Sequence, residues 1–155
     1  MEPIQRQAAR VLPVSPEGEV LLLQCQDPAR PGEPHWISIG GALDPGESHV
    51  DAALRELREE TGISASPEDL SEPLHRARYP FSWDGRSYVN DATMFAMPLE
   101  REVTINLDGL EPGEVGNVLA WGWWTPEGLR DDGTAANPDL PDVMRLALDT
   151  IGVAT

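Results

Sequence analysis

The sequence predicts an α+β fold, either as a general α+β arrangement or as an α/β/α sandwich with a mixed central sheet. Short apolar runs bounded by turn residues indicate strands, and two segments with helical periodicity interrupt and follow them. The order of strands, one helix, more strands and a final helix is typical of helices layered on a sheet. A length of 155 residues fits a single domain over residues 1–155.

The first part of the chain is expected to form strands around a proline-rich loop. Apolar runs at residues 8–14 and 20–25 are separated by residues 15–18, whose composition is typical of a hairpin turn. Residues 26–34 are rich in proline and charge, which indicates a surface loop that is either a lid or a simple connection. A short strand over residues 35–39 then leads into a pair of glycines.

Residues 48–61 carry the clearest helical pattern. Apolar residues recur at i, i+3, i+4 and i+7 from Val50, so one face of the helix is apolar. Ser48 is the expected N-cap, and Gly62 is expected to end the helix in a left-handed conformation.

The remaining elements are further strands and a terminal helix. Asp84-Gly85 lies between two strand-like segments, and this dipeptide is a strong hairpin signal. A loop over residues 107–117 follows the hairpin. The expected elements are strands at 74–83, 86–97 and 118–124, a short helical turn at 126–129, a loop at 131–138 and a helix at 139–151.

The composition excludes several classes of function. A formal net charge of -16 argues against a general nucleic-acid binder and against attachment to an anionic membrane surface. All 11 cations are arginine, so Schiff-base chemistry on lysine and a P-loop are excluded. Cys25 is the only cysteine, which excludes an intramolecular disulfide. Neither a signal-peptide pattern nor a membrane-length apolar run occurs, so we expect a cytoplasmic protein.

Three carboxylates share one face of the predicted central helix. At about 100° per residue, Glu59 and Glu60 lie within about 60° of Glu56. A solvated acidic face is the ordinary interpretation, but three clustered glutamates repel one another and a cation would relieve that repulsion. Hard oxygen ligands that leave coordination positions open suit Mg²⁺ or Mn²⁺, which bridge to substrate phosphates.

A fixed pattern of glycine, glutamate and arginine runs from Gly41 to Ile63. Its members are Gly41, Glu47, Arg55, Glu56, Leu57, Glu59, Glu60, Gly62 and Ile63. At roughly 5–7% usage per residue type, a chance match is on the order of 10⁻⁹ per starting position, so the pattern is specific. It resembles the Nudix box of the Nudix hydrolase superfamily without departure, which implies the Nudix-type α/β/α sandwich.

The resemblance implies a divalent-metal-dependent pyrophosphohydrolase that cleaves a nucleoside diphosphate linked to another moiety X. Modified (d)NTPs, dinucleotides and nucleotide sugars are the expected substrates, with Mg²⁺ as cofactor and Mn²⁺ as a substitute. In that family the metal ligands correspond to Glu56, Glu59, Glu60 and the carbonyl of Gly41.

Further roles follow from the same resemblance. Glu47 is expected to pair with Arg55 as structural support of the site. The general base is left open between Glu59, Glu60 and an acid of the later loop, for which Glu114 and Glu111 are the candidates.

Substrate contacts are assigned to Trp36, which precedes the glycine pair, and to Arg86 and Tyr88, which alternate along one strand. Core packing of the tryptophan and a solvated strand face are the competing interpretations. We expect a small nucleotide-type substrate, no nucleic-acid or membrane partner, and a monomer or homodimer. A catalytically silent nucleotide-binding or regulatory module is the alternative function. An isomerase is disfavoured because that chemistry usually needs a site cysteine, and Cys25 lies far upstream.

Overall fold

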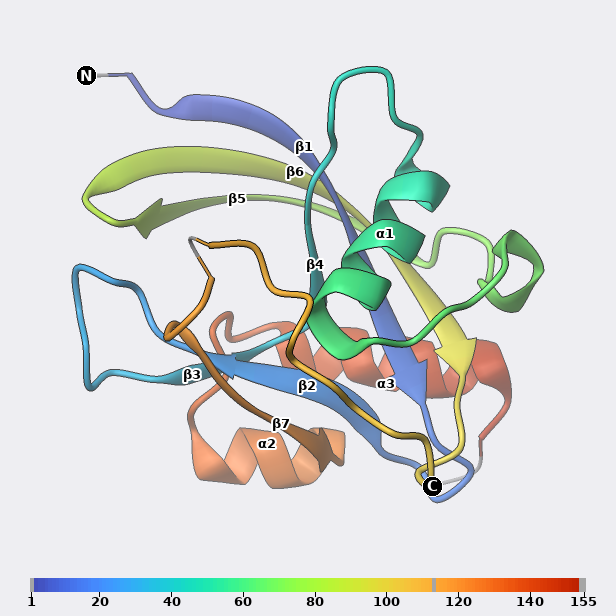
Figure 1. Ribbon diagram of the computed structural model, residues 1–155. Helices are drawn as coiled ribbons and strands as arrows, with labels where there is room; N and C mark the ends of the chain where they lie inside the picture. Colours follow the sequence, from blue (N-terminus) through green and yellow to red (C-terminus); the bar gives the residue numbers. More distant parts are fainter. Residues whose placement is uncertain (1, 113, 154–155) are drawn as a thin grey trace.

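The computed structural model describes residues 2–112 and 114–153 (Figure 1). The strands are β1 (Ile4–Val14), β2 (Val20–Cys25), β3 (His35–Ile37), β4 (Ile39–Ala42), β5 (His75–Trp83), β6 (Arg86–Pro98) and β7 (Val118–Trp124). The helices are α1 (His49–Thr61), the 3₁₀ turn η1 (Pro67–Asp69), α2 (Pro126–Asp132) and α3 (Leu140–Ile151). Among these described helices, none is long and apolar enough to cross a membrane.

The sheet contains both parallel and antiparallel pairs, and β1 is its central strand. On one side of β1, two different strands pair with different parts of its edge. One edge of β1 pairs in parallel with β6 from Ile4↔Tyr88 to Val14↔Pro98. The other edge pairs antiparallel with β4, and it meets β2 at the register pair Val14↔Val20. β2 pairs in turn with β3 and β7. The predicted hairpin of the first two strands therefore holds at its turn, and β1 and β2 then diverge to take different partners.

Helices cover both faces of the sheet, as Figure 1 shows with α1 in front and α3 behind. On one face, α1 packs through Leu57 against Ala9, Val11, Leu21 and Leu23. On the other face, α2 and α3 pack through Leu129, Met144 and Leu148 against Ala8, Leu12, Val20 and Leu22. Successive residues of β1 and β2 thus alternate between two cores, as side chains on a strand must. This arrangement confirms the predicted α/β/α sandwich with a mixed sheet.

The caps of α1 are those expected from the sequence. The Ser48 hydroxyl accepts the Asp51 N–H at 3.0 Å. At the other end, Gly62 has a φ of 78° and its N–H donates to the Arg58 carbonyl. These two caps fix where the acidic segment of the helix begins and ends relative to the sheet.

Four local differences from the sequence prediction appear. β1 begins at Ile4 rather than at residue 8, because its parallel pairing with β6 extends that far. The short strand at 35–39 is divided at Ser38 into β3 and β4, which pair with different strands. The turn at 126–129 is a helix that continues to Asp132, into the predicted loop. The 3₁₀ turn η1 was not predicted.

Candidate metal and substrate site

The site lies where α1 faces β4, and two glycines of β4 make the close approach of its carboxylates possible. The Gly40 N–H donates to Glu60 Oε1 at 2.8 Å. A Cβ on Gly41 would lie 2.6 Å from Glu56 Oε1, well inside van der Waals contact. Gly40 has a φ of 152°, and a Cβ there would meet the Ala9 carbonyl oxygen at 2.3 Å. The glycine pair therefore lets the strand backbone touch both carboxylates.

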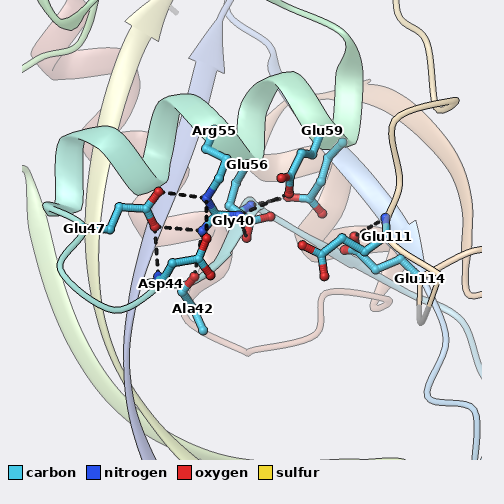
Figure 2. A network of polar contacts seen from close by, with 10 residues as sticks. Gly40, Ala42, Asp44, Glu47, Arg55, Glu56, Glu59, Glu111 and Glu114 are labelled. Carbon is cyan, nitrogen blue, oxygen red and sulfur yellow. Dashed lines mark hydrogen bonds and ion pairs between the residues drawn. The ribbon is translucent and has the colours of Figure 1, made fainter.

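Three carboxylates converge at this point, two from α1 and one from the loop before β7. Glu56, Glu60 and Glu114 each place a carboxylate oxygen within 4.8 Å of the others. Glu56 and Glu60 are buried, and Glu114 is half-buried. Figure 2 shows the Glu111 and Glu114 side chains approaching α1 from the loop. The Glu111 N–H donates to Glu114 Oε1 at 3.2 Å, which orients that carboxylate.

The cluster is electrostatically unfavourable while it is fully ionised and without a cation. Burial raises the pKa of Glu56 to about 7, and the charges of Glu114 and Glu59 add to that rise although Arg55 opposes it. Burial also raises the pKa of Glu60 well above its usual range, with further contributions from Glu56 and Glu114. The pKa of Glu114 is raised mainly by burial. Three hard oxygen donors with this excess of negative charge fit a divalent cation such as Mg²⁺ or Mn²⁺.

Arg55 organises the other acidic side chains of the motif (Figure 2). Its guanidinium donates to both carboxylate oxygens of Glu47, at 2.8 and 2.9 Å, and to the Ala42 carbonyl at 3.0 Å. These contacts join the loop after β4 to α1. Hydrogen bonding from Arg55 lowers the pKa of Glu47 to about 2.

The same arginine contacts two of the three helix glutamates. Arg55 Nη1 donates to Glu56 Oε1 at 3.0 Å and to Glu59 Oε2 at 3.1 Å. Glu56 nevertheless belongs to the three-carboxylate cluster, whereas Glu59 does not. The structure thus brings together Glu56, Glu60 and Glu114, with Gly41 against Glu56, and holds Glu59 beside them on Arg55.

A cavity of about 520 Å³ extends from the carboxylates across the sheet. Glu56, Glu60 and Glu114 line one part of it, and an aromatic pair lines another. In that pair the Phe81 and Tyr88 rings stack with centroids 5.0 Å apart. The Arg6 guanidinium lies over both rings, 5.0 and 4.9 Å from their centroids. One cavity therefore combines an acidic part with a part that has aromatic faces and positive charge.

The three predicted substrate contacts lie in different places. Tyr88 lines the cavity. Trp36 packs instead against Gly122 and forms an edge-to-face contact with Trp124, with ring centroids 5.3 Å apart. Arg86 is exposed beside the β5–β6 turn and does not line the cavity described above.

Sequence reasoning missed other residues of the cavity wall. Arg6 and Phe81 were not singled out. Strand register brings Arg6 opposite Asn90 and Phe81 opposite Tyr88. The only sequence signal was the presence of arginine and aromatic residues at alternating positions of predicted strands, and it did not show which strands are neighbours.

The loop of residues 26–34 is attached to the far rim of the cavity. Asp27 Oδ1 accepts the Ala29 N–H at 3.0 Å and the Asp84 N–H at 2.7 Å. Gln26 and Asp27 line the cavity together with Ser82 and Trp83 of the β5–β6 hairpin. The loop is therefore tied across the cavity rim to the hairpin turn.

The sandwich and its acidic helix-and-loop site define a class of protein, and comparison with known families identifies it. A family model of the NUDIX domain matches residues 4–145. The chain belongs to this family, which confirms the resemblance seen in the sequence.

Two curated relatives match over part of the chain. An RNA pyrophosphohydrolase of Erythrobacter litoralis is 42% identical over 79 residues, which are 51% of this chain and 45% of the relative. An asymmetrical bis(5′-nucleosyl)-tetraphosphatase of Mus musculus is 48% identical over 58 residues, 37% of each chain. The matched segments span less than half of these relatives.

Solved structures resemble the fold over nearly the whole chain. A MutT protein from Methanosarcina mazei has a TM-score of 0.65 at 20% identity, covering 96% of this chain and 97% of its own. An Ap4A hydrolase from C. elegans has a TM-score of 0.62 at 22% identity, covering 95% and 98%. At these identities the similarity establishes the fold alone.

Proposed function

We propose that the chain is a divalent-metal-dependent pyrophosphohydrolase that cleaves a nucleoside diphosphate linked to another moiety X. The observation that carries the proposal is the cluster of Glu56, Glu60 and Glu114 in the wall of a cavity large enough for a nucleotide. Phosphoryl transfer depends on positioning and on neutralising charge, and this cluster offers a place for the cation that does both.

Each site residue has a role in this proposal. Glu56, Glu60 and Glu114 hold the cation, and the Gly41 carbonyl and Glu59 are further candidate ligands at the edge of the cluster. A bound Mg²⁺ or Mn²⁺ would neutralise phosphate oxygens and lower the pKa of a coordinated water. Glu47 and Arg55 hold the loop after β4 against α1, and so position the Gly41 backbone.

Proton acceptance is assigned to a carboxylate in the cluster or beside it. Glu59, Glu60 and Glu114 are the three candidates, and they differ in their surroundings. Glu60 accepts a hydrogen bond from the Gly40 N–H and is almost fully buried, whereas Glu59 accepts a hydrogen bond from Arg55 Nη1. Substituting each by glutamine separates the roles, because loss of a general base reduces turnover by roughly 10²–10⁴-fold and shifts the pH profile.

The test measures hydrolysis of a panel of nucleoside triphosphates, dinucleoside polyphosphates and nucleotide sugars, with the products converted to inorganic phosphate by added pyrophosphatase and alkaline phosphatase. A 5′-triphosphorylated RNA is added because one relative is an RNA pyrophosphohydrolase. Reactions contain Mg²⁺, Mn²⁺ or EDTA, and they compare wild type with Glu60→Gln and with Glu68→Gln, an exposed matched control.

Metal-dependent turnover that is retained in Glu68→Gln and falls by orders of magnitude in Glu60→Gln supports the proposal. No turnover across the panel, together with a thermal shift from one nucleotide, favours the nucleotide-binding module instead. Light scattering on the same preparation decides between a monomer and a homodimer, the two states expected.

A further inference from the structure

Three polar side chains, one from each of β1, β6 and β5, form a row next to the stacked aromatic pair. Arg6 of β1 is in register with Asn90 of β6, and Asn90 is in register with Tyr79 of β5. Arg6 Nε donates to Asn90 Oδ1 at 2.7 Å, and Asn90 Nδ2 donates to the Tyr79 hydroxyl at 3.4 Å. All three line the cavity. The row is therefore one connected hydrogen-bonded unit.

A second arginine joins this row from further along β1. The next register positions are occupied by the small residues Ala8, Ala92 and Ala77. Arg10 follows Ala8 on the same face of β1, and its Nε donates to the Tyr79 hydroxyl at 3.3 Å. Its Nη1 donates to the Ser38 carbonyl at 2.7 Å. Arg10 thus links the row to the β3–β4 bend beside the carboxylates.

These contacts leave the Tyr79 hydroxyl as a fixed donor. A phenolic hydroxyl has two lone pairs and one proton, and both lone pairs here accept hydrogen bonds, from Arg10 and Asn90. Among the described residues, no acceptor receives the Tyr79 proton. The terminal nitrogens of Arg6 likewise donate to no described residue. The row consequently presents donors to the cavity and suits a ligand with several acceptor atoms.

Neither guanidinium of this row has a direct ion-pair partner among the described residues. The sequence contains 27 acidic residues, yet neither Arg6 nor Arg10 forms an ion pair with any described carboxylate. Burial and the nearby Arg10 charge lower the pKa of Arg6. An anion between the two would relieve this repulsion and desolvation.

We propose that Arg6, Arg10 and Tyr79 bind a phosphoryl group of the substrate's moiety X, so that substrates carrying a phosphate beyond the cleaved diphosphate are preferred over neutral nucleotide sugars. The proposal rests on the proposed function for its substrate, but not for the existence of an anion site. Tyr79 is assigned as a specificity-determining residue whose O–H donates to a phosphoryl oxygen.

The first experiment measures binding without catalysis. Inorganic tripolyphosphate is titrated into the full chain in EDTA at about pH 6 by calorimetry. The variants are Arg6→Gln, Tyr79→Phe and the control Arg76→Gln, an exposed arginine paired with Asp91. We expect Kd to rise at least tenfold in Arg6→Gln, about threefold to tenfold in Tyr79→Phe, and less than twofold in the control, because Arg6 supplies a full positive charge to the anion whereas Tyr79 supplies one hydrogen bond.

Three outcomes would overturn the inference. They are no measurable binding to wild type, equal weakening in Arg76→Gln, and equal competition by a neutral nucleoside. Thermal unfolding shows whether each variant is folded, and Arg6→Lys, which keeps the charge, should retain most of the affinity if Arg6→Gln does not fold. A chain that binds tripolyphosphate but hydrolyses nothing would refute the proposed function while leaving this site in place.

A second experiment applies if the panel yields a substrate. The ratio of kcat/KM for a dinucleoside polyphosphate to that for a nucleotide sugar is measured in wild type and in Tyr79→Phe. We expect this ratio to fall by about threefold to tenfold, through the polyphosphate substrate alone. An unchanged ratio would remove Tyr79 from substrate discrimination.

Discussion

Removing the charge of Glu56 should stabilise the metal-free chain above neutral pH. The folded chain holds the Glu56 proton up to a pKa of about 7, whereas the ordinary value is 4.5. Folding therefore binds a proton between these pH values, and stability declines as the pH rises through this window. At about 1.4 kcal/mol per pH unit, the cost to the ionised folded state is about 3 kcal/mol.

The perturbation is Glu56→Gln, which removes the titration but keeps an oxygen that can accept the hydrogen bond from Arg55 Nη1. The assay is urea unfolding in EDTA at several pH values between about 5 and 8. Over that range, the free energy of unfolding of wild type should fall by about 3 kcal/mol more than that of the variant. Glu17→Gln, at an exposed turn, controls for the general effect of removing one negative charge.

Added Mg²⁺ gives the complementary measurement. A cation at the cluster should restore the stability of wild type at pH 8, and it should stabilise Glu56→Gln much less. Parallel pH curves for wild type and Glu56→Gln would refute the reasoning, because the burial of an ionisable Glu56 would then carry no cost. A Glu17→Gln curve identical to that of Glu56→Gln would refute it as well.

Three further predictions concern the rest of the site. Gly41→Ala should reduce metal-dependent turnover by more than tenfold with an unchanged circular dichroism spectrum, because the new Cβ would lie 2.6 Å from Glu56 Oε1; near-wild-type turnover would contradict this. Cys25 should react with a thiol reagent at pH 8 far more slowly in the folded chain than in urea, since burial raises its pKa to about 12. Asp27→Ala should increase proteolysis of the loop that carries it, because the Asp84 N–H loses its acceptor; an unchanged cleavage rate would exclude this attachment.

The central helix was predictable because its signals are local. Apolar spacing, the Ser48 cap and the Gly62 terminus all lie within fifteen residues of sequence, and each has one physical interpretation. The presence of most strands was also predictable from local signals, namely apolar runs bounded by turn residues. Strand pairing was not, since the parallel partner of β1 lies 84 residues away in register and no short-range pattern specifies it. β1 diverges from β2 because β4 pairs with the same edge of β1 beyond the turn.

Helical periodicity placed the three motif glutamates on one face, but it could not distinguish among them. Arg55 contacts both Glu56 and Glu59, so the distinction lies in which carboxylate oxygens come close to one another, and those of Glu56 and Glu60 do. Glu114 was a candidate from its place in the loop before β7, and the structure brings it into the cluster. Whether Glu59 or Glu114 joins Glu56 and Glu60 in the cluster depends on the path of that loop, which packs Gly109 against the Glu59 backbone.

A chain with a net charge of -16 can accept a polyanion only where the local field is reversed, and the cavity offers two means of reversing it. The carboxylates require a cation before they can attract phosphate, whereas Arg6 and Arg10 attract it directly. Gly40 lies between the two parts: its N–H binds Glu60, and a Cβ there would meet the Arg10 side chain at 2.8 Å. Because Glu60 also favours the charged form of Arg10, an anion that binds the arginines competes with the cluster, and a cation at the cluster removes that competition. Cation and phosphate should therefore bind cooperatively, and tripolyphosphate affinity should rise when Mg²⁺ replaces EDTA in wild type but not in Glu60→Gln.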